Sequence, residues 1–126
     1  MRFKSFLLVA GIIALLTACG SKEFTVSGES EHWLADVNVS QTNDGYETQE
    51  LLLTYTGDDM ESVGEFNYNV DSVGSFGKSG NELEGDGTFV DKNEANPTNA
   101  KVTEQTDFEV TIEWDGKTET IQLNQQ

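Results

Sequence analysis

The chain has 126 residues and a formal net charge of −16, from 23 acidic and seven basic side chains. This length suits a single domain. Charge of this sign and size repels nucleic acid and anionic phospholipid surfaces, so the composition excludes a nucleic-acid-binding protein.

The amino-terminal segment has the zones of a signal peptide. Arg2 and Lys4 give it a basic start, and residues 6–16 (FLLVAGIIALL) form an unbroken apolar run of 11 residues. A helix needs roughly 20 apolar residues to cross a hydrocarbon core, so this run is too short to span a membrane. It suits the hydrophobic region of a signal peptide. We therefore predict that residues 1–18 form a signal-peptide helix that directs export and is then removed.

The leader ends in Leu16, Thr17, Ala18 and Cys19, which resemble the lipobox of bacterial lipoproteins. The resemblance implies transfer of a diacylglyceryl group to the Cys19 thiol and cleavage before that residue. Cys19 is also the only cysteine, and a lone free thiol is a liability in an oxidising compartment. Two or three acyl chains, each gaining about 0.8 kcal/mol per buried methylene, give stable anchoring. We expect an exported protein that is lipid-anchored to the outer face of the cell membrane, with the bilayer as its partner.

Removal of the leader leaves 108 residues with a net charge of −18, because the leader holds two basic residues and no acidic one. We divide this mature chain into a lipidated tether, residues 19–23, and an acidic domain, residues 24–126. The acidic domain should stand away from an anionic membrane surface.

Four segments after the leader alternate apolar and polar side chains, a pattern that is typical of half-buried strands. No segment after the leader has a sustained helical period, so we predict an all-β domain. The alternating apolar residues are Trp33, Ala35, Val37 and Val39; Leu51, Leu53 and Tyr55; Phe66, Tyr68 and Val70; and Phe108, Val110, Ile112 and Trp114.

The clearest turn is Asp115-Gly116, because this dipeptide accepts the positive φ values of a two-residue hairpin. Such a turn predicts a hairpin over residues 107–124, with Val110 opposite Ile121 and Phe108 opposite Leu123. The apolar residues then share one face of the hairpin.

Two stretches lack this regularity. The middle of the chain is glycine-rich, and we expect a loose, edge-like region with turns at residues 74–87. Residues 91–100 (DKNEANPTNA) contain the only proline and no apolar side chain larger than alanine, so we expect a loop or an irregular connection. About seven or eight short antiparallel strands then predict an immunoglobulin-like two-sheet β-sandwich, with a closed barrel as the alternative.

Residues 27–33 (SGESEHW), 93–102 (NEANPTNAKV) and 110–119 (VTIEWDGKTE) resemble a small, uncharacterised lipoprotein family of Gram-positive, bacillus-type bacteria. The likeness spans nearly all of the mature chain. The resemblance implies localisation in the cell envelope and does not imply any particular chemistry.

No residue pattern indicates catalysis. His32 is the only histidine, and neither a hydrolytic triad nor a zinc site with three or four protein ligands can be assembled from it by sequence alone. We interpret His32 as a surface histidine beside Trp33. Of the larger aromatic residues, only Tyr46 falls outside the alternating pattern, so the others are expected to pack in the core.

Calcium is the alternative cofactor, since hard cations bind loops rich in oxygen ligands. Asp91, Asn93 and Glu94 are the candidate ligands, although Ala95 stands where a further oxygen is wanted. The sequence thus favours a non-enzymatic binding or structural accessory domain whose envelope protein or polymer partner it does not identify. A calcium-dependent binding module and an envelope hydrolase are the alternatives.

Overall fold

The computed structural model describes residues 21–95 and 102–125. It contains eight strands and one short 3₁₀ helix, so the domain is all-β as predicted. The elements are β1 (Ser21–Glu29), β2 (Trp33–Thr42), β3 (Glu47–Tyr55), η1 (Met60–Ser62), β4 (Phe66–Asp71), β5 (Ser75–Asn81), β6 (Thr88–Ala95), β7 (Phe108–Trp114) and β8 (Lys117–Gln125).

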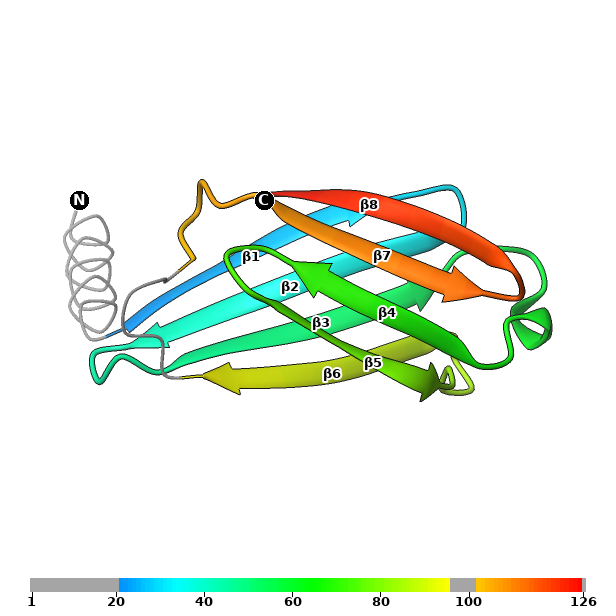
Figure 1. Cartoon of the computed structure of the whole chain (residues 1–126), viewed down its shortest axis with the longest axis horizontal. Coiled ribbons are helices and arrows are strands. Elements are labelled where there is room, and N and C mark those ends of the chain that lie inside the picture. Colours follow the sequence, from blue (N-terminus) through cyan, green and yellow to red (C-terminus); the bar gives the residue numbers. More distant parts are fainter. Residues whose placement is uncertain (1–20, 96–101, 126) are drawn as a thin grey trace, which may run out of the picture.

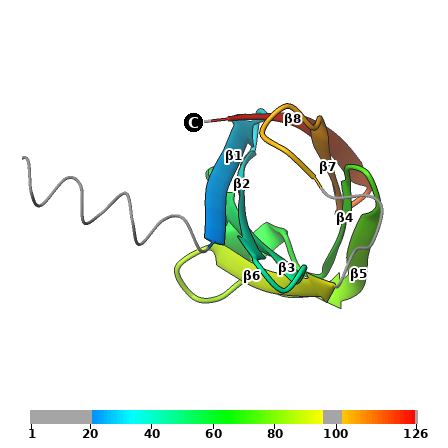
Figure 2. The ribbon, with the colours of Figure 1, turned by 90° about the vertical axis from the view of Figure 1, so that its left-hand side faces the viewer.

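All eight strands belong to one antiparallel sheet in the order β5-β4-β7-β8-β1-β2-β3-β6. Figure 1 shows the strands β1, β2, β3 and β6 behind the strands β8, β7, β4 and β5, and the end-on view of Figure 2 shows the sheet curling until β5 and β6 approach each other. The sheet is therefore nearly closed around a single interior.

This topology does not confirm the predicted immunoglobulin-like sandwich of two separate sheets. The two layers are joined because β1 pairs with β8 through Val26↔Gln125 and Ser27↔Asn124. Gly28 follows directly, and a Cβ atom on it would lie 2.3 Å from the carbonyl oxygen of Gln122. Glycine therefore permits the close approach that makes one continuous sheet. The alternation of apolar residues could not reveal this pairing, because it is the same in a sandwich and in a curled sheet.

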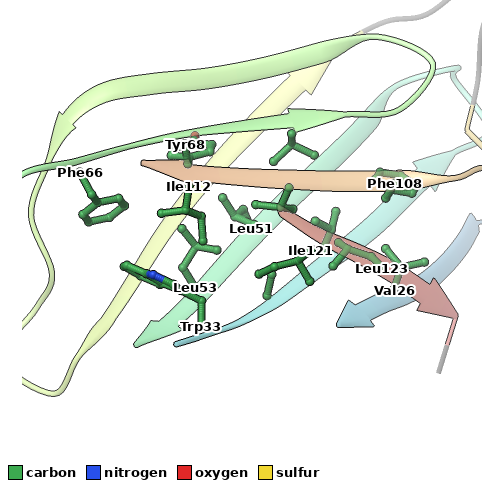
Figure 3. Packing of buried hydrophobic residues seen from close by; sticks show 14 of the residues in the cluster. Val26, Trp33, Leu51, Leu53, Phe66, Tyr68, Phe108, Ile112, Ile121 and Leu123 are labelled. Atoms are coloured by element: carbon green, nitrogen blue, oxygen red, sulfur yellow. The ribbon is translucent and has the colours of Figure 1, made fainter. Parts of the chain in front are cut away.

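The core lies inside the curled sheet, where the predicted apolar positions meet (Figure 3). Period two places every second side chain of a strand on the interior face. Nineteen apolar side chains of the described residues are buried there, among them Trp33, Val37, Leu51, Leu53, Phe66, Tyr68, Phe108, Ile112, Ile121 and Leu123.

The predicted hairpin over residues 107–124 is confirmed. Val110 lies opposite Ile121 and Phe108 opposite Leu123 in the paired strands β7 and β8. Asp115 has φ 47° and Gly116 has φ 72°, the left-handed values that a tight hairpin turn requires.

Side chains of the edge strand β6 contact both β4 and the other edge strand, β5. Asp91 of β6 accepts a hydrogen bond from the Tyr68 hydroxyl of β4, and Lys78 Nζ of β5 lies 3.6 Å from the same Asp91 oxygen. The Phe89 ring of β6 lies 5.2 Å from Phe66 and 5.6 Å from Tyr68, both of β4. An inward-pointing charge on an edge strand also opposes edge-to-edge association of sheets.

Two sequence expectations need adjustment along the chain. The expected loop at residues 91–100 begins as the second half of β6, because residues 91–94 alternate inward and outward despite their polarity. Residues 96–100 lie outside the described part. The expected tether, residues 19–23, overlaps the structured domain because β1 begins at Ser21. The glycine-rich region contains β5, a mostly exposed edge strand, as expected.

Candidate functional site

The antiparallel strands give the molecule two ends of different composition. We call one the His32 end: it consists of the connections 30–32, 56–65, 82–87 and 115–116. We call the other the Ser21 end: it contains the start of β1 at Ser21, the end of β8 at Gln125 and the described connections 43–46, 72–74 and 102–107. In Figure 1 the His32 end lies on the right and the start of β1 lies on the left.

The His32 end is strongly acidic. Its four connections hold nine acidic residues and no Lys or Arg, whereas the described connections of the Ser21 end hold three acidic residues. Like charges at this density repel one another and attract cations from solution. The nine residues are Glu31, Asp58, Asp59, Glu61, Glu65, Glu82, Glu84, Asp86 and Asp115.

A hydrogen-bonded polar cluster at this end is centred on Glu119 of β8. Its Oε1 accepts hydrogen bonds from Ser30 Oγ at 2.5 Å and from the backbone N–H of His32 at 3.0 Å. Its Oε2 lies 2.5 Å from His32 Nδ1. Burial raises the pKa of Glu119, but the hydrogen bonds from Ser30 and His32 outweigh it and hold that pKa below its ordinary value. Glu119 is therefore a carboxylate acceptor that fixes both neighbours.

The His32 ring is held by aromatic neighbours as well. It stacks on Tyr55 with centroids 6.2 Å apart and an interplanar angle of 9°, and it meets the Trp114 ring edge-on at 5.7 Å. The other ring nitrogen, Nε2, lies 3.9 Å from Oε2 of Glu31. Glu31 is exposed to solvent, so the ring presents this nitrogen toward the outside.

This cluster does not have the connectivity of a hydrolytic triad. In a triad the histidine lies between the nucleophile and the acid, so that it can take the hydroxyl proton. Here Ser30 donates to Glu119, and His32 contacts the same carboxylate from its other side. The carboxylate, and not the histidine, is the centre of the arrangement, and it fixes the positions of both Ser30 and His32.

Sequence reasoning identified His32 as a surface residue and missed Glu119. A signal was present in the predicted hairpin, because its register places Glu119 opposite the inward-facing Ile112. An inward-facing carboxylate requires hydrogen-bond donors. Extending the β1–β8 register toward the His32 end places residue 32 opposite residue 119, but that pairing was not predictable.

The aromatic residues behave as expected. Trp33, Tyr68 and Trp114 are buried and Tyr55 packs against the core, while Tyr46 is 55% exposed. They do not form an open platform for a sugar or a peptide. The rings of Tyr55, Phe66 and Trp114 surround the Trp33 indole, whose buried N–H has no hydrogen-bond partner.

A shallow hollow of about 240 Å³ lies next to η1 at the His32 end. It combines apolar and acidic linings, and Met60 is among the most exposed large apolar residues. The side chains that line it are those of Met60, Val63 and Leu83, with Glu61, Glu82 and Glu84.

The calcium candidates do not converge. Asp91, Asn93 and Glu94 lie on β6, where Asp91 faces inward and contacts Tyr68 and Lys78. Glu94 has the opposite parity and is exposed. A strand cannot wrap several oxygens around one ion, so these residues do not form a calcium loop.

The predicted lipobox, Leu16 to Cys19, lies outside the described residues. Within residues 21–95 and 102–125, no helix has the length and hydropathy needed to cross a bilayer. No family model, curated protein or solved structure matches this chain.

Proposed function

We propose that the chain is a membrane-anchored lipoprotein of the cell envelope, held by acylated Cys19, whose acidic β domain binds or supports a partner without catalysis. The observation that carries this proposal is the lipobox-like sequence from Leu16 to Cys19 after an apolar run of 11 residues. The start of β1 at Ser21 supports it, since the folded domain begins two residues after the cysteine.

This spacing gives the two ends different roles. Only Gly20 lies between Cys19 and β1, so acylation of Cys19 holds the Ser21 end beside the lipid headgroups. Strands of nine or ten residues rise about 3.3 Å per residue, so the His32 end then lies up to about 30 Å farther out. The His32 end is the surface that a partner in the envelope meets first.

The charge of the His32 end favours a partner that carries positive charge. Its nine acidic side chains steer basic protein segments or cationic polymers toward the hollow beside Met60. Met60 and Leu83 offer flexible apolar contacts to the aliphatic part of such a ligand. A pull-down with the full chain at low and at high salt tests this, because steering of this kind weakens as ionic strength rises.

The anchor is tested by Cys19→Ser in the full chain. Incorporation of radiolabelled palmitate and sedimentation with membranes are measured for both proteins. We expect label and membrane association for the native chain and the loss of both for Cys19→Ser. Unchanged processing and membrane association of Cys19→Ser would refute the proposal. Turnover of a wall polymer, ester or peptide by the native chain would refute its non-enzymatic part.

A further inference from the structure

We propose that His32 and Glu31 bind a borderline divalent cation such as Zn²⁺ at the His32 end, with Glu119 orienting the imidazole. This inference goes beyond the proposed function and does not depend on the lipid anchor. It rests on the geometry of one histidine ring between two carboxylates.

The contact with Glu119 determines which ring nitrogen is available. Glu119 already accepts from Ser30 and from the His32 backbone, so it acts as a carboxylate, and His32 Nδ1 must carry the hydrogen of that contact. In a neutral imidazole the lone pair is then on Nε2. A carboxylate that accepts from one ring nitrogen while the other binds the metal is the usual second shell of a histidine–metal site.

The second ligand stands at a suitable distance. His32 Nε2 and Glu31 Oε2 are 3.9 Å apart, too far for a hydrogen bond. A zinc ion takes about 2.0–2.1 Å to nitrogen and about 2.0–2.2 Å to a carboxylate oxygen. The sum of these lengths exceeds the observed separation, so one ion spans the pair without a backbone movement. The exposed Glu31 side chain can swing further in to reach a tetrahedral angle.

The surroundings favour binding at this point. The His32 ring is fixed by Tyr55, Trp114 and Glu119, so little rotational freedom is lost when it binds an ion. The acidic connections of the His32 end raise the local concentration of cations. Two protein ligands leave the remaining positions to water, so we expect an open site that is weaker than a structural zinc site.

A nitrogen ligand separates this site from diffuse attraction to acidic side chains. Imidazole suits Zn²⁺ and binds the hard cations Ca²⁺ and Mg²⁺ poorly, whereas carboxylates alone attract all three. His32 is the only histidine, so the imidazole resonances of a chain purified without a histidine tag report this site alone.

The experiment titrates Zn²⁺, and separately Mg²⁺, into the full chain in non-ionic detergent at physiological salt. Binding heats and the His32 imidazole NMR signals are recorded. We expect a saturable shift of these signals with Zn²⁺ and none with Mg²⁺. Glu31→Gln should weaken zinc binding several-fold, and Glu119→Gln should weaken it about 10- to 100-fold. His32→Gln should abolish the discrete heat.

Glu61→Gln is the matched control, because it removes one charge from the same end without contacting His32. Its zinc affinity should stay within about twofold of the native value, since only the general field changes. Near-ultraviolet circular dichroism checks that each variant is folded. Binding that survives His32→Gln, equal responses to Zn²⁺ and Mg²⁺, or no shift of the His32 signals in the native chain would overturn the proposal.

Discussion

The two ends of the curled sheet differ in the side chains that line their interior. At the His32 end, Trp33, Tyr55, Phe66 and Trp114 pack ring against ring beneath connections that carry nine acidic residues. The interior near the Ser21 end is lined in part by polar side chains that are hydrogen-bonded to one another. Gln41 Nε2 and Gln49 Nε2 donate to the buried Glu47 at 2.7 and 2.8 Å, and Gln41 also donates to the carbonyl of Val102.

This contrast separates two tasks. The Tyr55 and Trp114 rings pack against the His32 ring, and Glu119 holds it from the interior side, so the His32 end is suited to specific contacts. The amide and carboxylate network near the Ser21 end satisfies buried polar groups next to the point where the chain continues toward Cys19. The end with the packed aromatic rings is therefore also the end with the candidate site.

The largest expected loss of stability follows from a change among the packed rings of Trp33, Tyr55, Phe66 and Trp114. Trp33→Ala removes a fully buried indole from contact with three rings, and it should lower the free energy of unfolding by about 3–5 kcal/mol. Chemical denaturation of the full chain measures this loss. Tyr46→Ala at the Ser21 end is the comparison, and it should change stability by less than about 0.5 kcal/mol because Tyr46 is 55% exposed. Similar losses for the two variants would remove the distinction between the ends.

The next largest loss of stability is expected at the β1–β8 contact, which joins the two layers of the sheet. Gly28→Ala places a Cβ 2.3 Å from the Gln122 carbonyl oxygen and 2.9 Å from Ile121 Cγ2, so β1 must move away from β8. We expect a loss of about 1–3 kcal/mol, the usual cost of overpacking. Gly74→Ala in the β4–β5 turn is the control, since nothing lies within 4 Å of its Cβ position. A neutral result for Gly28→Ala in thermal melts would show that the close β1–β8 contact is not required.

Loss of the side-chain contacts that Asp91 of β6 makes with β4 and β5 should lower stability less. Tyr68→Phe removes the hydroxyl that donates to Asp91, and we expect a loss of about 1 kcal/mol at neutral pH. Denaturation midpoints compare this variant with the native chain. Lys78→Met removes the other partner of Asp91 and should cost less, because Lys78 is more than half exposed. A larger loss for Lys78→Met would reverse this order of importance.

The contact between Tyr68 and Asp91 should make stability depend on pH at both the acid and the alkaline end. Burial raises the pKa of Asp91. The Tyr68 hydroxyl, the Lys92 backbone N–H and the Lys78 charge together lower that pKa by more than burial raises it, so the pKa of Asp91 lies below its ordinary value. This stabilisation is present above the unfolded pKa of about 3.9 and is lost as pH falls through the folded value. Burial and then Asp91 raise the pKa of Tyr68. That stabilisation is present below the unfolded pKa of about 10 and is lost as pH rises beyond it.

The stability difference between the native chain and Tyr68→Phe should therefore be largest near neutral pH and shrink toward both extremes. Denaturation curves at acid, neutral and alkaline pH measure it. A difference that does not vary with pH would mean that the Tyr68–Asp91 contact is absent in solution.

The sequence predicted those parts of the fold that depend on neighbours along the chain. Alternation identified the interior residues of β2, and the Asp115-Gly116 turn determined the β7–β8 register. The β1–β8 pair depends on residues that are about 100 positions apart, and no local pattern encodes it. The sequence did not predict the strand at residues 91–94 because these residues are polar. They form part of the edge strand β6, where one face is open to solvent and Asp91 on the other face accepts a hydrogen bond from Tyr68.

The candidate site was predictable only in part, for the same reason. His32 stood out as the sole histidine. Its orientation, however, depends on Glu119, which lies 87 positions away in the sequence and is brought next to it by β8. The leader and Cys19 are local patterns of the sequence, and they remain predictions about residues outside the described part.

The orientation of the domain on a membrane tests the proposed lipid anchor at Cys19 most directly. Asp44→Cys at the Ser21 end and Glu84→Cys at the His32 end remove the same charge from exposed positions, and each supplies a free thiol for a fluorophore when Cys19 is acylated. Energy transfer to an acceptor on the lipid headgroups is then measured in vesicles that carry the full chain. We expect strong transfer from residue 44 and weak transfer from residue 84, which lies about 30 Å farther away along the strands. Equal transfer from both positions, or stronger transfer from residue 84, would contradict an anchor at Cys19 that presents the His32 end outward.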